Sequence, residues 1–457
     1  MPESGQPTSF DVTVIGAGVV GCAIARKYTL LGARVLLLEK AADALDGASK
    51  ANSAILHTGF DAPVGSIELA CIQEGYRQYE EIHAKMNLPL DRCGAMVLAW
   101  TPEQEARLPD LMAQARTNGV DDVASLTREQ ILAREPNLSQ AVRAGFVVPR
   151  EALIDPWSAP HGYLTQALIN GATFRRNTEV LSGVFDGQGW VLDTSTGPVQ
   201  TTRVINAAGL YGDIVDQRLI GRADFDIRPR KGQFVVFDKT AARLARHILL
   251  PVPTATTKGI VVCRTIWGNL LVGPTAEEQQ DRVNADLVPE TLEMLRDKAA
   301  EILPALADEE VTTTYAGLRP ACGDKEYQIR RHPENMITVG AIRSTGLSAA
   351  LGIAEYIARM DETPWTPIPE PEWPAMPMLA EDQTRDWQTA GNGGILCHCE
   401  RVTRREVAAA MSGPNAAKSL AGLKRRTRVT MGRCQGFYCS GALQEMTATC
   451  LKPEDAE

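Results

Sequence analysis

Four of the ten cysteines lie in two close pairs near the C-terminal end of the chain, spaced C-x-C and C-x4-C. Four thiolates are the ligands that a [2Fe-2S] cluster needs. A structural zinc ion is the alternative, but the cysteines of its pairs are usually separated by two or more residues. The spacing therefore favours an iron–sulfur cluster held by Cys397, Cys399, Cys434 and Cys439.

A second chemical motif, G-x-G-x-x-G, follows a short apolar run near the N-terminus. Gly16 permits a tight turn, Gly18 lets a pyrophosphate approach the backbone, and Gly21 lets the following helix pack on the strand. A second apolar run ends at Glu39, where a carboxylate can accept hydrogen bonds from ribose hydroxyls. A glycine-rich turn of some other βα unit is the alternative, but strand, helix, second strand and acid together predict dinucleotide binding.

Other stretches can complete such a site. The loop at residues 46–61 follows Glu39 and carries His57, and histidine titrates near neutral pH. A lone histidine is more often structural, so its place after the ribose-binding acid is what makes it a candidate. Residues 204–213 predict a strand running into a small-residue turn that passes the phosphates. Residues 336–360 predict a strand, a glycine-bounded loop and a helix whose N-terminus faces an anion.

The elements that must position these residues alternate between helical and sheet patterns. Helical patterns occur at 65–86, 102–138 and 285–302, with helix-start signals at Thr101 and Thr127. Strand patterns occur at 96–100, 228–237 and 258–274. Six prolines between residues 364 and 377 predict a semi-rigid linker over 363–394, ahead of a small further domain.

Composition limits the classes of function. The 457 residues are 44% hydrophobic and 23% charged, which suits a soluble globular protein of several domains. The net charge of −9 argues against nucleic acid or an anionic membrane as the partner of the whole chain. An anionic substrate would therefore need a local basic pocket. The N-terminus has no signal-peptide pattern and no apolar run is long enough to span a membrane, so we expect a cytoplasmic protein.

Several of these stretches resemble the D-amino-acid-oxidase-like class of FAD oxidoreductases, and within it most of all glycerol-3-phosphate and L-2-hydroxyglutarate dehydrogenases. The matching pieces are GAGVVG, SKANSAILHTG, INAAGLYGD, YAGLRP and VGAIRSTGLS, which span most of residues 10–360. The resemblance implies an α/β fold in which a Rossmann-type FAD-binding domain is interleaved with an antiparallel α+β substrate domain. It implies FAD segments at about 8–85, 145–220 and 320–362, and substrate-domain segments at about 86–144 and 221–319.

The C-terminal stretches ILCHCERVTRREVAAAM and LAGLKRRTRVTMGRCQGFYC resemble the bacterioferritin-associated-ferredoxin-like [2Fe-2S] domain. The large subunits of anaerobic glycerol-3-phosphate dehydrogenases end in such a domain after a similar FAD region. The resemblance implies a small helical domain over 395–452. Eight basic residues lie near the cysteines in sequence: Arg401, Arg404, Arg405, Lys424, Arg425, Arg426, Arg428 and Arg433. Their charges would favour the reduced form of an anionic cluster. The alternative is that they only form a solvated surface.

The resemblance also implies the contacts of the flavin. Ser49 and Asn52 would lie near the pyrophosphate or the ring, and Val180 would reach the adenine through its backbone. The absence of an obvious attachment residue predicts non-covalent FAD. The residues expected at the ADP part are Gly16, Ala17, Gly18, Val19, Val20, Gly21, Glu39 and Lys40. Those expected at the phosphates are Ala208 and Gly209, and those expected at the isoalloxazine are Gly346, Leu347 and Ser348. With Ser49, Asn52 and Val180, these complete the expected set.

Oxidation of an alcohol at a flavin requires a base for the O–H proton and transfer of a hydride from carbon to N5. The resemblance makes His57 the catalytic base and Arg319 the side chain that holds the substrate's anionic group. A planar guanidinium suits carboxylate and phosphate equally well. A structural salt bridge is the alternative for Arg319, and Lys258 and Arg343 are weaker candidates for the substrate pocket.

We therefore expect an FAD- and [2Fe-2S]-dependent dehydrogenase of a small anionic alcohol, most of all one that oxidises glycerol 3-phosphate to dihydroxyacetone phosphate. A 2-hydroxy acid such as L-2-hydroxyglutarate, an amino acid or an opine is the alternative substrate. A non-catalytic electron-transfer protein is the alternative role. Because a [2Fe-2S] cluster takes one electron at a time, we expect it to serve further subunits of a hetero-oligomer or a quinone, with any membrane contact made through a partner.

Overall fold

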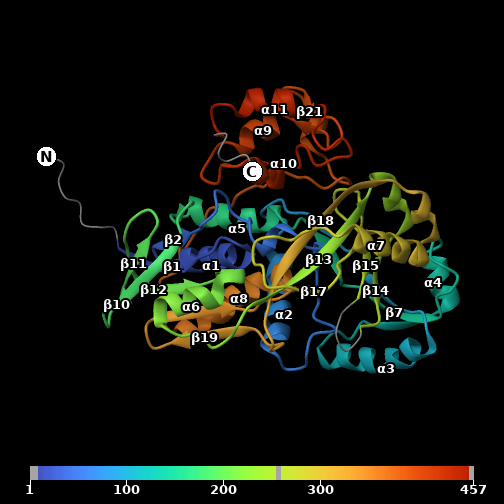
Figure 1. The fold of residues 1–457 in the computed structure, drawn as a ribbon, viewed down its shortest axis with the longest axis horizontal. Helices are drawn as coiled ribbons and strands as arrows, with labels where there is room; N and C mark the ends of the chain where they lie inside the picture. The colour runs from blue at the N-terminus through green and yellow to red at the C-terminus, as the bar shows by residue number, and fades with distance from the viewer. Residues whose placement is uncertain (1–8, 254–258, 452–457) are drawn as a thin grey trace.

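Two large sheets and a small C-terminal unit make up the part of the chain described by the computed structural model, residues 9–253 and 259–451 (Figure 1). In Figure 1 the strands β1, β2 and β12 lie on the left and β7, β14 and β15 on the right, with the C-terminal helices above both. The candidate residue Lys258 falls outside the described residues.

The first sheet has eight strands in the order β10-β11-β12-β1-β2-β9, extended by β20 on β12 and β19 on β20. The strands β1, β2, β9, β12 and β20 pair in parallel, as a dinucleotide-binding fold requires. Strands β1 and β2 are almost wholly buried because helices cover both faces of a parallel sheet. The bounds are β1 (Phe10–Ile15), β2 (Val35–Leu38), β9 (Thr173–Arg175), β10 (Val180–Phe185), β11 (Trp190–Thr194), β12 (Val199–Asn206), β19 (Gln328–His332) and β20 (Met336–Gly340).

The second sheet has nine strands in the order β17-β13-β16-β15-β14-β5-β7-β6, with β18 also paired to β13. All its pairings are antiparallel except that of β14 with β5. Its strands are β5 (Ala95–Ala99), β6 (Ala124–Thr127), β7 (Ala144–Val148), β13 (Arg228–Phe237), β14 (Ile248–Pro251), β15 (Val261–Arg264), β16 (Leu270–Gly273), β17 (Glu277–Glu278) and β18 (Val311–Ala321). A three-stranded sheet consists of β3 (Ile55–Leu56), β8 (Ala152–Ile154) and β4 (Leu90–Asp91).

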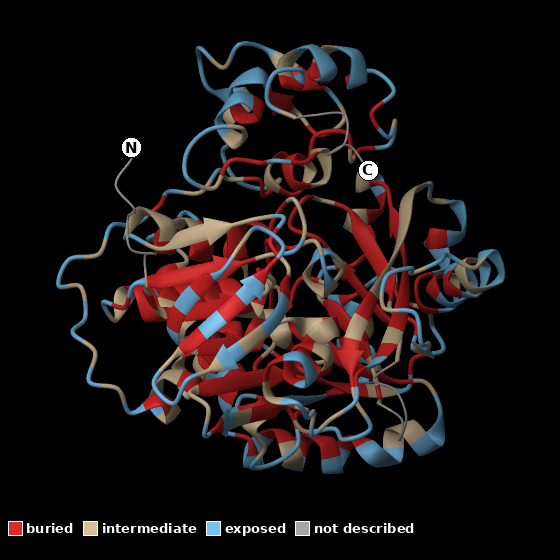
Figure 2. Ribbon diagram, turned by 60° about the vertical axis from the view of Figure 1, so that its left-hand side comes forward, coloured by how far each residue is buried: buried red, intermediate tan, exposed pale blue. Residues whose placement is uncertain are grey.

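Helices cover both sheets. The helix α1 packs against α5 and α8, and α8 packs against α2, so the first sheet shares one large core with these helices. Figure 2 shows that the strands through the middle of the body are mostly buried while helices at its rim carry exposed faces. The bounds are α1 (Val19–Leu30), α2 (Ile67–Ile82), α3 (Pro102–Thr117), α4 (Arg128–Arg134), α5 (Ser158–Ile169), α6 (Gly212–Ile220), α7 (Pro289–Ile302) and α8 (Gly346–Asp361).

The C-terminal unit is small and mostly helical. It contains a two-stranded sheet and three helices around a core that includes Cys397, Cys439 and Leu423. Its elements are β21 (Ile395–Cys397), β22 (Val402–Thr403), α9 (Arg404–Ala410), α10 (Leu420–Thr427) and α11 (Ser440–Thr447). The described residues also contain short 3-10 helices: η1 (Ala48–Lys50), η2 (Gly209–Tyr211), η3 (Lys239–Leu244), η4 (Pro304–Asp308) and η5 (Asp386–Gln388).

The interleaved architecture expected from the sequence is confirmed, and the two helix starts are as predicted. Thr101 and Thr127 each cap a helix, the second in a capping box with Gln130. The pattern over 102–138 forms two helices, with β6 between them. One boundary needs correction: β7 was expected in an FAD segment beginning near 145, but it pairs with β5 and β6 in the second sheet. A short apolar run fits either sheet, so its pattern cannot assign it.

The Pro-rich segment packs against the body, which corrects the expectation of a semi-rigid linker without core contacts. It forms no helix or strand between 363 and 385, but Leu379 and Ala380 are buried in the main core. The backbone amide of Met376 donates to the carbonyl of Met86, and that of Glu381 donates to Ile266. The apolar residues between the prolines pack against the body, and the spacing of the prolines does not predict this packing.

Within the described residues, no helix has both the length and the apolar character needed to cross a bilayer.

Candidate functional site

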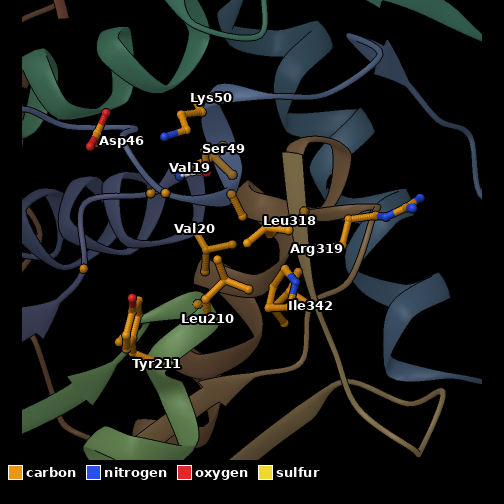
Figure 3. Close-up of a pocket in the computed structure, with 18 of the residues that line it drawn as sticks. Val19, Val20, Asp46, Ser49, Lys50, Leu210, Tyr211, Leu318, Arg319 and Ile342 are labelled. Atoms are coloured by element: carbon orange, nitrogen blue, oxygen red, sulfur yellow. Dashed lines mark hydrogen bonds between the residues drawn. The ribbon is translucent and has the colours of Figure 1, made fainter. Parts of the chain in front are cut away.

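A cavity of about 490 Å³ lies between the first sheet and β18 (Figure 3). It is lined by the turn from β1 to α1, by η1, by η2, by the middle of β18 and by the start of α8. Figure 3 places Tyr211 and Asp46 at one end and Arg319 at the other. The cavity wall includes the expected cofactor residues except Ala17, Gly21 and Ser348.

The turn from β1 to α1 has the geometry that a pyrophosphate needs. Gly16 has a φ of +99°, and a Cβ there would lie 2.6 Å from the carbonyl oxygen of Ala207. A Cβ on Gly21 would lie 1.8 Å from the carbonyl oxygen of Gly16, so the helix can pack this closely only with glycine. The backbone amide of Val19 donates to Ser49 Oγ at 3.0 Å. A dinucleotide phosphate therefore fits the start of α1.

The ribose end is built around Glu39. Its Oε2 accepts from the backbone amide of Ala17 at 2.8 Å and its Oε1 from that of Ala41 at 2.9 Å. Burial raises the pKa of this carboxyl, although the two amides act in the opposite direction. Nearby, Lys40 Nζ lies 3.3 Å from the centre of the Tyr211 ring. Tyr211 was not among the expected residues, because nothing in a small-residue turn marks which side chain faces the cavity.

The start of α8 is linked to the loop that carries His57. Gly346 and Leu347 line the cavity. Ser348 lies one residue further and is buried; its Oγ accepts from the backbone amide of His57 at 2.9 Å and donates to the carbonyl of Ile55 at 3.2 Å. Asn52 also lines the cavity, and its carbonyl accepts from the hydroxyl of Tyr315 at 2.8 Å. Ser348 therefore positions the histidine loop.

His57 is held by a buried acid that the sequence did not reveal. Its Nδ1 lies 2.8 Å from Oε2 of Glu151, whose side chain is 0% exposed. The other oxygen of Glu151 accepts from the backbone amide of Thr58 at 2.6 Å and from its hydroxyl at 2.8 Å. Glu151 lies 94 residues along the chain from His57 and has no motif around it, so only the fold brings the two together. His57 is not part of the cavity wall among the described residues.

A second pair of the same kind lies in the other sheet. His247 Nδ1 is 2.6 Å from Oε1 of the fully buried Glu135. This pair is outside the cavity wall, so a histidine on a buried glutamate is in itself a structural device in this fold. What distinguishes His57 is its link through Ser348 to the start of α8.

Arg319 and Arg343 both line the cavity, and Lys258 is outside the described residues. The Nη2 of Arg319 donates to the carbonyls of Thr275 at 2.6 Å and Lys231 at 3.1 Å. Burial lowers the pKa of this guanidinium to about 10, with a further contribution from neighbouring arginines. Arg343 Nη1 donates to the carbonyl of Lys325 at 2.9 Å. Some of the hydrogen-bond donors of both guanidinium groups therefore bond to backbone carbonyls of the protein itself.

The four expected ligand cysteines gather as two pairs, without disulfides. Cys397 and Cys439 are within hydrogen-bonding reach of each other, as are Cys399 and Cys434. The backbone amide of Tyr438, helped by those of Gly436 and Phe437, holds the pKa of Cys434 below its usual value.

No group of three or more acidic, histidine or cysteine side chains among the described residues is arranged for a single metal ion. Two cysteine pairs instead suit two irons, and amides directed at sulfur are typical of iron–sulfur sites.

The basic residues around the cysteines mostly pair with carboxylates, which corrects the expectation of a basic field. Arg426 Nη2 lies 2.8 Å from Asp43 Oδ1, and Arg425 Nη1 lies 3.3 Å from Asp46 Oδ1. Further pairs are Arg401 with Glu381, Arg405 with Asp386, Arg428 with Glu400 and Arg433 with Asp238. The first two fix α10 to the body. A count of positive charges in sequence does not reveal which of them have partners.

Comparisons with known proteins agree with this geometry. The model of the family "FAD dependent oxidoreductase" matches residues 11–360, and that of the "BFD-like [2Fe-2S] binding domain" matches residues 395–448. The chain is 31% identical to the glycerol 3-phosphate dehydrogenase of Caloramator mitchellensis, over 98% of this chain and 96% of that protein. It is 28% identical to one of the subunits of the anaerobic glycerol-3-phosphate dehydrogenase of Escherichia coli, over 96% and 89% of the two chains.

A solved structure matches as well. The L-alpha-glycerophosphate oxidase of Mycoplasma pneumoniae, with FAD bound, superposes with a TM-score of 0.76 at 26% identity. The match covers 80% of this chain and 97% of that one. The match to the FAD family includes the residues that line the cavity, and the match to the [2Fe-2S] domain includes all four cysteines. The chain belongs to the family of FAD-dependent oxidoreductases and carries a C-terminal BFD-like [2Fe-2S] domain.

Proposed function

We propose that this enzyme is a dehydrogenase that oxidises glycerol 3-phosphate to dihydroxyacetone phosphate and passes the electrons through its [2Fe-2S] cluster to a partner. The observation that carries the proposal is the extent of the likeness to the Caloramator mitchellensis glycerol 3-phosphate dehydrogenase. It covers 98% of the chain, so the flavin region and the cluster domain are matched together. FAD supplies the acceptor for the substrate's hydride.

The role of base falls to His57. One oxygen of Glu151 accepts from the backbone amide and the hydroxyl of Thr58, and we assign its other oxygen as the acceptor of Nδ1–H from His57. That hydrogen bond selects the tautomer in which Nε2 carries the lone pair, and it holds the ring in one orientation. Nε2 then takes the proton of the substrate's hydroxyl.

The anionic end of the substrate is assigned to Arg319 and Arg343. Both line the cavity, and Figure 3 places Arg319 at the end opposite Tyr211. They are close enough for the charge of Arg343 to lower the pKa of Arg319 further, although burial has the larger effect. A phosphate dianion placed between two such cations would relieve that repulsion.

The first test of this chemistry is Glu151→Gln. A neutral amide can present either its oxygen or its NH2 group to Nδ1, so it does not select one tautomer of the imidazole. We expect kcat to fall because the lone pair is no longer held on Nε2, while the FAD content stays unchanged. Steady-state rates with FAD content measured in parallel would check this; an unchanged kcat would separate Glu151 from the base.

Arg319→Ala separates a binding role from a structural one. If the guanidinium holds the phosphate, its loss should raise KM by about 10-fold or more and lower kcat less. If its hydrogen bonds to backbone carbonyls are its whole role, KM stays constant while the melting temperature falls. The comparison of KM with thermal stability in Arg319→Ala and Arg343→Ala decides between the two.

The route out of the enzyme runs through the C-terminal domain. Phe437 and Tyr438 lie between the ligands Cys434 and Cys439 and are 81% and 79% exposed. Large apolar side chains this exposed mark a contact surface. We therefore assign this loop to the contact with an electron-accepting partner, in line with the likeness to a chain that in Escherichia coli is one of several subunits. Membrane attachment, where it occurs, is then a property of that partner.

The experiment that tests the substrate is a comparison of kcat/KM values with an artificial dye as acceptor. Glycerol 3-phosphate should exceed L-2-hydroxyglutarate, amino acids and opines, and glycerol alone should be a poor substrate because it lacks the anion. A preference for L-2-hydroxyglutarate would replace the phosphate with a carboxylate as the recognised group. Turnover of none of them would instead favour a non-catalytic electron-transfer protein.

A further inference from the structure

We propose that two stacked indoles, Trp157 and Trp267, together with Arg428, form the contact through which electrons cross from the flavin cavity to the [2Fe-2S] cluster. The inference rests on the proposed function, since it requires electrons to move from flavin to cluster.

On the flavin side, the contact begins at the cavity wall. Pro156 and Lys50 both line the cavity. Trp157 follows Pro156, and its indole N–H donates to the carbonyl of Lys50 at 3.1 Å. The backbone amides of Trp157 and Ser158 both donate to Asp155 at 2.9 Å, which fixes the start of α5. The first indole is therefore held rigidly against the cavity wall.

The second indole continues the contact towards the C-terminal domain. The ring centres of Trp157 and Trp267 are 4.7 Å apart and their planes differ by 23°. The two residues are 9% and 6% exposed, so little water reaches the space around them. Trp267 lies between β15 and β16, far from Trp157 in sequence. The indole N–H of Trp267 is buried without an acceptor among the described residues, a cost that leucine or phenylalanine would avoid if packing were its whole role.

On the cluster side, Arg428 closes the remaining gap. Its guanidinium carbon lies 4.1 Å from the centre of the Trp267 ring. Its Nε donates to Oε2 of Glu400 at 2.8 Å, and Glu400 follows the ligand Cys399. Arg428 has a φ of +65°, a conformation that costs energy for a residue other than glycine. The end of α10 is thus shaped so that this side chain lies over the indole.

The C-terminal domain is fixed in the position that keeps the contact continuous. Arg426 and Asp43 form a buried ion pair across the interface. The side-chain amide of Gln435, next to the ligand Cys434, donates to the carbonyl of Thr312 at 3.2 Å. A Cβ on Gly432 would lie 2.3 Å from Cβ of Cys399, so the two ligand loops also pack closely. Dense packing between two redox centres favours electron tunnelling over a water-filled gap.

The electrons balance without oxidation of either indole. Each substrate leaves two electrons on the flavin, and they cross one at a time. In each crossing the flavin loses one electron and the cluster gains one, and the acceptor removes that electron before the next crosses. The proton that the hydride leaves on the flavin and the proton taken up by His57 both go to solvent. The rings only fill the space that each electron tunnels through.

The test compares two single-turnover rates in the holoenzyme. Glycerol 3-phosphate is mixed with oxidised enzyme without oxygen; flavin bleaching is followed by absorbance and cluster reduction by freeze-quench electron paramagnetic resonance. In Trp267→Leu we expect flavin bleaching at the wild-type rate, unchanged equilibrium potentials of both centres, and cluster reduction slower by about 10-fold or more. Trp267→Phe should recover most of the rate. Trp190→Leu, a buried indole in β11, is the matched control and should change neither rate.

Two results would overturn the inference. One is a Trp267→Leu enzyme that reduces its cluster at the wild-type rate. The other is slow cluster reduction in both Trp267→Leu and Trp267→Phe, together with faster hydrogen exchange over residues 415–428 in Trp267→Leu. In that case the C-terminal domain would have separated from the body, and this separation, not the loss of the indole ring, would be the cause. A wild-type enzyme whose cluster never becomes reduced by substrate would contradict the proposed function instead, and so is distinguishable.

Discussion

His57→Ala is expected to keep its FAD and its fold but to lose kcat by about 10²–10⁴-fold, the usual contribution of a positioned general base. The residues that we expect to contact the flavin do not include the imidazole: within the described chain, the cavity wall includes neighbouring residues of this loop but not His57 itself. The backbone amide that bonds Ser348 also remains after truncation. The loss should therefore be seen in the rate of flavin bleaching by glycerol 3-phosphate, with an unchanged flavin-to-protein ratio.

His247→Ala is the matched control for this variant. His247 also pairs through Nδ1 with a fully buried glutamate, and its side chain is 20% exposed against 21% for His57. His247→Ala should lower stability by a similar amount and leave the bleaching rate near the wild-type value. Equal losses of rate in both variants would mean that the effect is one of folding, and near wild-type turnover in His57→Ala would place the base elsewhere.

Cys434→Ser is expected to separate the two halves of the reaction. Flavin bleaching by substrate needs only the FAD region, so its rate should stay close to that of the wild type. The paramagnetic signal of the reduced cluster should be lost or altered, because the serine oxygen replaces one of four thiolates. Electron transfer to the native acceptor, measured with a membrane preparation of the source organism, should fall to background, and hydrogen peroxide formation should stay slow.

Cys450→Ser provides the comparison, since Cys450 is an exposed thiol in the same domain outside the two cysteine pairs. It should retain the signal and the transfer rate. If Cys434→Ser still reduced the native acceptor at the full rate, the cluster would not lie on the electron path. Zinc without iron in elemental analysis of the wild-type protein would contradict the cluster itself.

Sequence patterns identified the parts of the site whose chemistry depends on neighbours in sequence. The glycine motif, the acid at the end of β2 and the spacing of the four cysteines each carry their own geometric requirement. Gly16 and Gly21 occupy positions where a Cβ would meet the backbone at 2.6 Å and 1.8 Å. The interleaved fold followed from the resemblance, although the assignment of β7 did not, since five apolar residues suit either sheet.

Residues that act through tertiary contacts were not predictable in this way. Glu151 is an acid without a motif, and only the fold places it 2.8 Å from His57. The arginines near the cysteines were expected as a basic field, but Arg426 and Arg425 are held by Asp43 and Asp46 from the flavin region. In the sequence, nothing distinguishes Trp157 and Trp267 from ordinary core residues, and only the structure shows that they stack. In each case the partner comes from a distant segment, and one sequence contains no record of that pairing.

We propose that electrons pass in order from glycerol 3-phosphate to flavin and then to the cluster, and a single anaerobic time course tests this order. Oxidised enzyme is mixed with glycerol 3-phosphate in the absence of oxygen, and flavin absorbance and the cluster's rhombic paramagnetic signal are recorded over the same time course. We expect the flavin to bleach first and the signal then to rise as part of the flavin colour returns. Bleaching with no signal, or a signal that precedes bleaching, would contradict it.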